Sequence, residues 1–369
     1  MKIKLLIAGL LFINGITAQE KGDKYIESDV IPLAGKKGFS FETKAGDFVF
    51  KPFVLVQTSL KANYYDDEGL DLADQDNIAN SGFEIGNALL GFSGKAFDRL
   101  TFNLTLNAAQ SGDALLQQAW FDLNLKDELR FRVGKFKTPF NQGYLVTLGE
   151  TLFPSLPISL TSAVNIPYSL NSVNPNIATG FDLGVQMHGL IQEKWDYRIG
   201  IFNGTGSGVN GAKKTLSDDL GIPSLLYAAR LAFMPQGAMP SHQGSSADLH
   251  NHKSLIALST SYNVEANWQA SNDFRAGLEF AYLYRRWYFT GEAYYLQMNF
   301  TKKQAIATPY EFLGGYIQGG YFVCPKMQLA ARYDLYNRNG FSEDGFLNLS
   351  AIGVNYFISG YNLKLQAMY

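Results

Sequence analysis

The chain has 369 residues and a formal net charge of −2, with 17% charged and 14% aromatic residues. This mildly acidic balance excludes the basic surface that is typical of a nucleic-acid-binding protein. The single cysteine, Cys324, excludes an internal disulfide, so the chain is not a small disulfide-stapled scaffold.

The first residues are typical of an export signal. Lys2 and Lys4 precede an uncharged apolar run over residues 5–17, and Ala18 followed by Gln19 forms a small-residue cleavage site. The run is shorter than the ~20 residues that a transmembrane helix needs. We therefore predict a signal peptide over residues 1–18. Because Gln19 and not a cysteine follows the predicted cut, there is no sign of a lipoprotein anchor.

Patterns typical of β-strands dominate the rest of the chain. Over residues 100–109 apolar side chains alternate with hydroxyl and amide side chains, and strands of a transmembrane barrel show this two-residue period. No later uncharged stretch is long enough for a membrane helix, so a membrane-embedded fold has to be a closed barrel. The alternation recurs in residues 118–125, 129–134, 182–188, 195–201, 274–282, 327–335 and 361–369.

We expect residues 48–369 to form an all-β, transmembrane antiparallel β-barrel of about 16 strands, and residues 19–47 to form a periplasmic segment or a first strand. A soluble β-sandwich would show the same alternation, because it also buries one face of each strand. Aromatic residues near the strand ends favour the barrel, since transmembrane barrels carry aromatic girdles at both interfaces. These residues are Tyr64, Trp195, Tyr282, Trp287 and Tyr369.

The predicted connections alternate between short and long, as expected for periplasmic turns and outer loops. Short turns fall at residues 97–99, 126–128, 285–286 and 359–360, and long loops at residues 66–82, 138–179, 204–224 and 337–345. The connection over residues 235–253 is an exception, because it is long where a turn is expected.

Several short segments in a fixed order resemble a known family. They are RVGKFKTPF at 132–140, GIFNGTG at 200–206, GGYFV at 319–323, ARYDLY at 331–336 and GVNYFISGYNLKLQAMY at 353–369. Together they resemble the phosphate-selective porins, called porins O and P, over residues 48–369. Each segment alone is weak, but the ordered set is fairly specific.

The resemblance implies a 16-stranded barrel that assembles as a homotrimer, in which a constriction loop folds inward to narrow the pore. Residues 138–179 occupy the position of that loop, and their prolines would stiffen it. The alternation itself gives 15 strands from residues 53–65 onward, and residues 39–44 can supply another. Members of the family usually carry one more strand after the segment that matches residues 363–369, so the sequence leaves the closure of the barrel open.

Basic and acidic side chains are nearly balanced on the predicted inner faces. The basic residues are Arg130, Arg132, Arg198, Arg230, Arg275, Arg332 and Lys364, and the acidic residues are Asp122, Asp182, Asp196, Glu279, Glu292 and Asp334. Cationic side chains favour anions that shed water in a pore. We hypothesise that Arg130, Arg132 and Lys137, near the start of the constriction loop, bias the pore toward anions. The alternative is that they pair with Asp122 and Asp182 and brace the wall.

Three other patterns give only weak evidence for a phosphate-binding loop, a metal site or a hydrolase site. The glycine-rich residues 204–215 lack the Gly-Lys pair of a phosphate-binding loop. His242, His250 and His252 lie in the long connection without a convincing set of further metal ligands. A hydrolase would need a nucleophile beside the strand residue His188, and no such motif is present. We expect no metal, no cofactor and no enzymatic activity.

The sequence thus predicts an outer-membrane porin of a Gram-negative bacterium. Surrounded by membrane lipid, it would let small solutes, or anions such as phosphate, diffuse passively. The alternative is a barrel whose external loops bind a partner, because residues 66–76 form an acidic outer segment. Stepwise conductance distinguishes the channel from such an anchor.

Overall fold

The computed structural model describes residues 30–35, 38–66, 77–161, 180–204, 224–245, 251–264, 271–300, 310–337 and 346–369. The predicted signal peptide, most of the acidic segment 66–76, most of the glycine-rich segment 204–215 and His250 lie outside the described residues. The strands are β1 (Val30–Gly35), β2 (Gly38–Thr43), β3 (Phe48–Asp66), β4 (Asn77–Ala96), β5 (Leu100–Asn107), β6 (Leu116–Lys126), β7 (Leu129–Lys137), β8 (Phe181–Ile191), β9 (Trp195–Phe202), β10 (Leu226–Phe233), β11 (Lys253–Asn263), β12 (Ser271–Tyr284), β13 (Trp287–Phe300), β14 (Tyr310–Cys324), β15 (Met327–Asn337), β16 (Phe346–Phe357) and β17 (Lys364–Met368).

Short helices lie between the strands. They are η1 (Gly112–Ala114), α1 (Gln142–Leu145), η2 (Leu148–Glu150) and α2 (Ile158–Thr161). None of the helices in the described ranges has the length and apolar character that crossing a bilayer requires.

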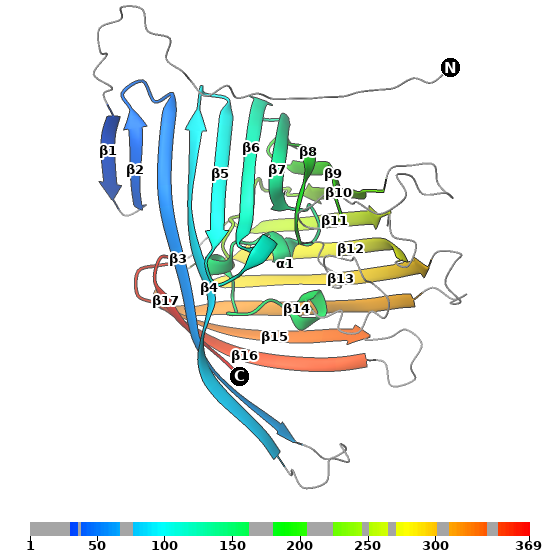
Figure 1. The fold of residues 1–369 in the computed structure, drawn as a ribbon. Coiled ribbons are helices and arrows are strands. Elements are labelled where there is room, and N and C mark those ends of the chain that lie inside the picture. Colours follow the sequence, from blue (N-terminus) through cyan, green and yellow to red (C-terminus); the bar gives the residue numbers. More distant parts are fainter. Residues whose placement is uncertain are drawn as a thin grey trace, which may run out of the picture.

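The strands form one antiparallel sheet in which each strand pairs with the next along the chain. In Figure 1 the sheet curves strongly, so that β3–β7 and β12–β16 run in crossing directions around helix α1. Among the described residues no ladder pairs β17 with β3. However, Gln57 of β3 and Gln366 of β17 donate hydrogen bonds to carbonyls only three residues apart, those of Pro154 and Thr151. Strands β3 and β17 therefore both approach the same stretch of chain.

The strand count agrees with the sequence pattern from residue 48 onward. Strands β3 to β17 are the 15 strands expected from the alternation, and β2 covers the additional candidate at residues 39–44. Among the described residues, β1 brings the sheet to 17 strands, in a stretch where the sequence indicated a periplasmic segment or a first strand. The all-β antiparallel fold is confirmed.

The sheet is apolar outside and polar inside, as β11 shows. Ile256 and Leu258 are 60% and 62% exposed, whereas Ser259 and Ser261 are 4% and 1% exposed. The same arrangement holds on β12, where Leu278 is exposed and Glu279 is buried. A soluble β-sandwich buries its apolar face, so this arrangement favours lipid around the sheet and contradicts the soluble alternative.

Connections at the two ends of the sheet differ in length. Because all pairs are antiparallel, alternate connections lie at the same end. The tight turns at residues 97–99, 127–128, 192–194, 285–286 and 325–326 share one end, and the β7–β8 connection lies at the other. The connection between β10 and β11 is at the short-turn end although it spans residues 234–252.

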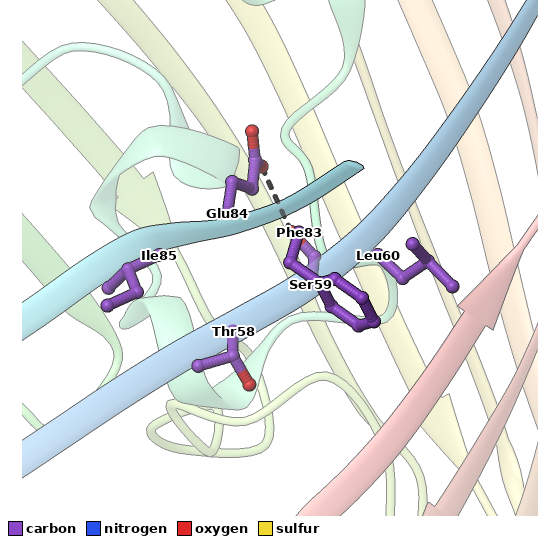
Figure 2. Close-up of a pocket in the computed structure, with 6 residues that line it drawn as sticks. All are labelled: Thr58, Ser59, Leu60, Phe83, Glu84 and Ile85. Atoms are coloured by element: carbon purple, nitrogen blue, oxygen red, sulfur yellow. Dashed lines mark hydrogen bonds between the residues drawn. The ribbon is translucent and has the colours of Figure 1, made fainter. Parts of the chain in front are cut away.

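The β3–β4 hairpin extends beyond its neighbours (Figure 1), because β4 pairs with β3 along its whole length but with β5 only over residues 89–96. A shallow pocket lies on this extension, where Ser59 donates to Glu84 (Figure 2). Its lining includes Leu60 and Phe83, which are 64% and 88% exposed. The pocket is therefore on the outer surface and is not a passage through the sheet.

Candidate functional site

The described part of the β7–β8 connection, residues 138–161, lies inside the curved sheet, and we call it the inner loop. Phe140 and Leu160 are fully buried in a cluster with Tyr294, Phe312 and Tyr316 of the wall. Leu152 and Phe153 are each 1% exposed and belong to a second cluster, with side chains from β10 to β13 and β15. The loop thus packs against much of the inner face, in the position expected for a constriction loop.

Carboxylates of the wall hold the two short α-helices of the inner loop. Glu292 of β13 accepts hydrogen bonds from the Gly143 backbone N–H, from Tyr316 Oη at 2.7 Å and from Tyr294 Oη at 3.0 Å. Asp334 of β15 accepts hydrogen bonds from the Ile158 backbone N–H at 3.0 Å and from the Ser159 hydroxyl. Both carboxylates accept bonds from N–H groups in first helical turns, where helices leave donors unpaired.

Amide side chains hold the middle of the inner loop, between its two α-helices, where the chain bends. Gln57 Nε2 donates to the Pro154 carbonyl at 2.9 Å, Asn355 Nδ2 to the Leu152 carbonyl at 2.9 Å, and Gln366 Nε2 to the Thr151 carbonyl at 3.2 Å. Each buried carbonyl therefore has a partner from the wall, which satisfies backbone groups that would otherwise cost free energy.

Gly143 allows α1 to approach the wall. A Cβ atom at this position would lie 2.6 Å from Tyr316 Oη and 3.0 Å from Glu292 Oε1. We expect Gly143→Val to destabilise the folded protein by ~1–3 kcal/mol, because the site is already packed. Denaturant unfolding in detergent measures this change. Gly82→Ala is the control, since a Cβ there meets no atom within 4 Å; equal effects of the two variants would contradict the close packing.

Most of the basic residues predicted to line the lumen form ion pairs with acidic residues. The N···O distances are 2.6 Å for Arg130–Asp127 and Arg132–Asp122, 2.7 Å for Arg198–Asp196, 2.8 Å for Arg230–Glu279, and 3.3 Å for Arg275–Asp273 and Arg332–Asp334. Their side chains lie on the face opposite the exposed apolar residues. The structure therefore pairs Arg132, Arg198, Arg230 and Arg332 with predicted acids. Arg130 and Arg275 instead pair with Asp127 and Asp273, which were not among the predicted acids.

The three cations singled out near the loop have different environments. Arg132 pairs with Asp122, which also contacts His188 Nε2 at 2.8 Å, and the guanidinium of Arg132 stacks 4.1 Å from the centre of the Trp120 ring. Arg130 contacts Asp127 in the turn and not the predicted Asp122 or Asp182. The wall-bracing alternative thus describes Arg132 well.

Asp182 and Lys137 both bind backbone groups. Asp182 accepts a hydrogen bond from the Gly204 backbone N–H at 2.6 Å. Lys137 Nζ donates to the carbonyls of Tyr144 and Val146 in the inner loop at 2.6 and 2.9 Å. Lys137 therefore joins the end of β7 to the loop that follows it.

Lys364 of β17 resembles Lys137 in its contacts. Its Nζ donates to the Thr151 carbonyl at 2.8 Å. Among the described residues, neither lysine has a carboxylate within ion-pair distance. These two ammonium groups at the inner loop thus differ from the paired arginines.

The amides that hold the loop were not singled out from the sequence. Gln57, Asn355 and Gln366 each lie on a strand, and inward polar positions in the alternation were the available signal. Gln243 also contacts the loop, and it lies in the irregular β10–β11 connection, where periodicity gives no signal. The two described histidines of that connection have different partners: His242 stacks on Tyr361, and His252 contacts Gln236.

Comparisons with known proteins agree on one architecture. A family model described as phosphate-selective porin O and P matches residues 56–369. The chain is similar to the solved anion-selective porin from Comamonas acidovorans, at 12% identity and a TM-score of 0.57, with 84% of each chain covered. It is also similar to the outer membrane channel DcaP of Acinetobacter baumannii, at 11% identity and a TM-score of 0.51, with 91% of this chain and 92% of that chain covered. No curated protein matches the sequence.

Proposed function

This chain belongs to the phosphate-selective porin O and P family and is an outer-membrane porin, and on that premise we propose that it lets small anions cross the outer membrane by passive diffusion. The observation that carries the proposal is the inner loop held across the lumen beside Lys137 and Lys364. Porins are channels and not enzymes, and we propose that this one has no catalytic role.

The anion preference is supported by the balance of charge at the inner loop. The paired arginines contribute little net charge, whereas Lys137 and Lys364 donate hydrogen bonds to backbone carbonyls and have no carboxylate within ion-pair distance among the described residues. The carboxylate of Glu292 is also hydrogen-bonded only to neutral groups in the described part of the chain, so it carries a negative charge without a basic partner there. Glu292 is only 5% exposed, however, and lies behind Gly143. The similar solved porin from Comamonas acidovorans is described as anion-selective, which also supports an anion preference.

Reversal potentials across a salt gradient in planar bilayers test the proposal. We expect stepwise currents and a reversal potential on the anion-selective side, with phosphate competing against chloride for the pore. A cation-selective channel would contradict the anion preference. Absence of stepwise currents would favour the alternative, a barrel whose outer loops bind a partner.

The lysines should control selectivity more than the paired arginines do. We expect Lys364→Gln and Lys137→Gln each to lower the anion-to-cation permeability ratio by a factor of a few, because each removes one positive charge near the loop. The control is the double variant Asp122→Asn with Arg132→Gln, which removes an ion pair and leaves the net charge unchanged. Equal shifts in all three proteins would contradict the role of the lysines.

We also propose that the mature protein begins at Gln19, as the N-terminal sequence pattern indicates, and that it assembles as a homotrimer, as the family resemblance implies. Mass spectrometry of the protein extracted from outer membranes tests the cleavage site. Chemical cross-linking in intact membranes tests the trimer, and a dominant monomer would contradict it.

A further inference from the structure

A second segment enters the lumen from the end opposite to the inner loop. It comprises residues 234–245 of the β10–β11 connection, and we call it the second inner segment. Met234, Gln243 and Gly244 within it are buried, and Met234 lies in the same hydrophobic cluster as Leu152 and Phe153 of the inner loop. The two segments therefore share one core, although they start from different ends of the sheet.

Gln243 joins the two segments. Its backbone N–H donates to the Glu150 carbonyl at 2.9 Å, and its side-chain Oε1 accepts from the Leu152 backbone N–H at 2.8 Å. The backbone and side chain of one glutamine thus pair with two nearby backbone groups of the loop, much as a neighbouring strand would.

The same glutamine is held by the wall. Gln318 Nε2 of β14 donates to Gln243 Oε1 at 3.1 Å, and Gln328 Nε2 of β15 donates to the Gln243 carbonyl at 3.2 Å. The side chain is almost inaccessible to solvent, since Gln243 is 2% exposed. Breaking a hydrogen bond at such a site leaves the partner unpaired and without water, so the contact is costly to lose.

We propose that Gln243 is a positioning residue that keeps the inner loop in the lumen, and that the second inner segment thereby helps to set the width of the pore. The inference rests on the proposed function, since it concerns the pore that the chain forms. The loop is attached to the wall by carboxylates at its two helices and by the amides of Gln57, Asn355 and Gln366 between them. Gln243 holds this middle stretch from the opposite end of the barrel.

The first test measures the position of the loop without any need for current. Thr151 is 8% exposed, so the thiol introduced by Thr151→Cys should react slowly with a maleimide in a Cys324→Ser background. We expect Gln243→Ala to raise the labelling rate about tenfold, which corresponds to the loss of the one hydrogen bond that this side chain makes with the inner loop. Gln243→Glu keeps acceptor oxygens for Leu152 and Gln318, and we expect it to restore slow labelling.

The matched control is Gln236→Ala. Gln236 lies in the same connection, but it bonds Ser254 and His252 at the exposed end and does not touch the inner loop. We expect this variant to label at the parent rate. If Gln243→Ala does not fold, Gln243→Asn replaces it, because its shorter side chain withdraws the acceptor and remains polar. Labelling that is unchanged in the Gln243 variant would overturn the proposal.

Single-channel recording of the same proteins separates this inference from the proposed function. We expect Gln243→Ala to give larger and noisier current steps than the parent, and Gln236→Ala to match the parent. Identical currents in all of them would overturn the role of Gln243 in pore width. If no protein conducts but labelling rises only in the Gln243 variant, the channel function fails while the positioning of the loop stands.

Discussion

Glu279→Ala should destabilise the folded barrel by ~3–5 kcal/mol, because removal of one partner leaves a buried charge without compensation. Glu279 of β12 and Arg230 of β10 lie 2.8 Å apart, with side chains that are 0% and 1% exposed. Asp196 lies 4.0 Å from Arg230, so it can neutralise the charge of Arg230 only in part once Glu279 is removed. Unfolding in denaturant, followed by tryptophan fluorescence in detergent micelles, measures the loss.

The double variant Arg230→Met with Glu279→Leu is the control for this prediction. Removing both charges avoids the uncompensated guanidinium, so we expect most of the lost stability to return. Arg230 also donates to Gln142 Oε1 of the inner loop at 2.8 Å, and that contact is lost in the double variant. A double variant as unstable as Glu279→Ala would show that the pair itself is not the cause.

Leu258→Arg should destabilise the protein in a bilayer by ~2–4 kcal/mol, which is the cost of a cationic side chain on the lipid face near the bilayer midplane. Leu258 is 62% exposed, lies in the middle of β11, and sits directly between Leu231 and Leu278 on the neighbouring strands. Unfolding from lipid vesicles measures the change, and the yield of assembled protein in outer membranes should fall in parallel.

This prediction separates a lipid-facing surface from a water-facing one. At an exposed position of a soluble protein the same substitution changes stability by only about 0.5 kcal/mol or less. Leu258→Met is the matched control, because it keeps an apolar side chain of similar volume, and we expect it to resemble the parent. An arginine variant as stable as the parent would contradict the conclusion that Leu258 faces lipid.

The sequence predicted the strands well because their signal is local. Alternation places Leu278 outward and Glu279 inward without knowledge of any other strand, and the aromatic ends indicated lipid on the outer side. Pairing across a tight hairpin was also within reach: Asp122 and Arg132 flank the turn between β6 and β7 and face each other in the register. The partner of Arg130 could not be predicted in this way, because Asp127 lies in the turn, where the strand alternation does not apply.

The candidate site was predictable only in outline. Residues 138–179 were expected to fold inward by resemblance, but the wall residues that hold the described part, residues 138–161, could not be chosen from the many polar positions on inner faces. The Arg230–Glu279 pair joins strands that are not neighbours, and the hydrogen bonds of Gln243 join two irregular connections. Neither leaves a pattern along the chain.

Composition and the two-residue period determined by themselves that this protein is a many-stranded β-structure with an apolar outer face, because these properties depend on each strand and its immediate neighbours. The tertiary structure decided which inward charges cancel, which lysines stay without a carboxylate partner among the described residues, and how the two inner segments meet. Those contacts depend on the curvature that brings distant strands around one loop, and curvature is a property of the whole sheet.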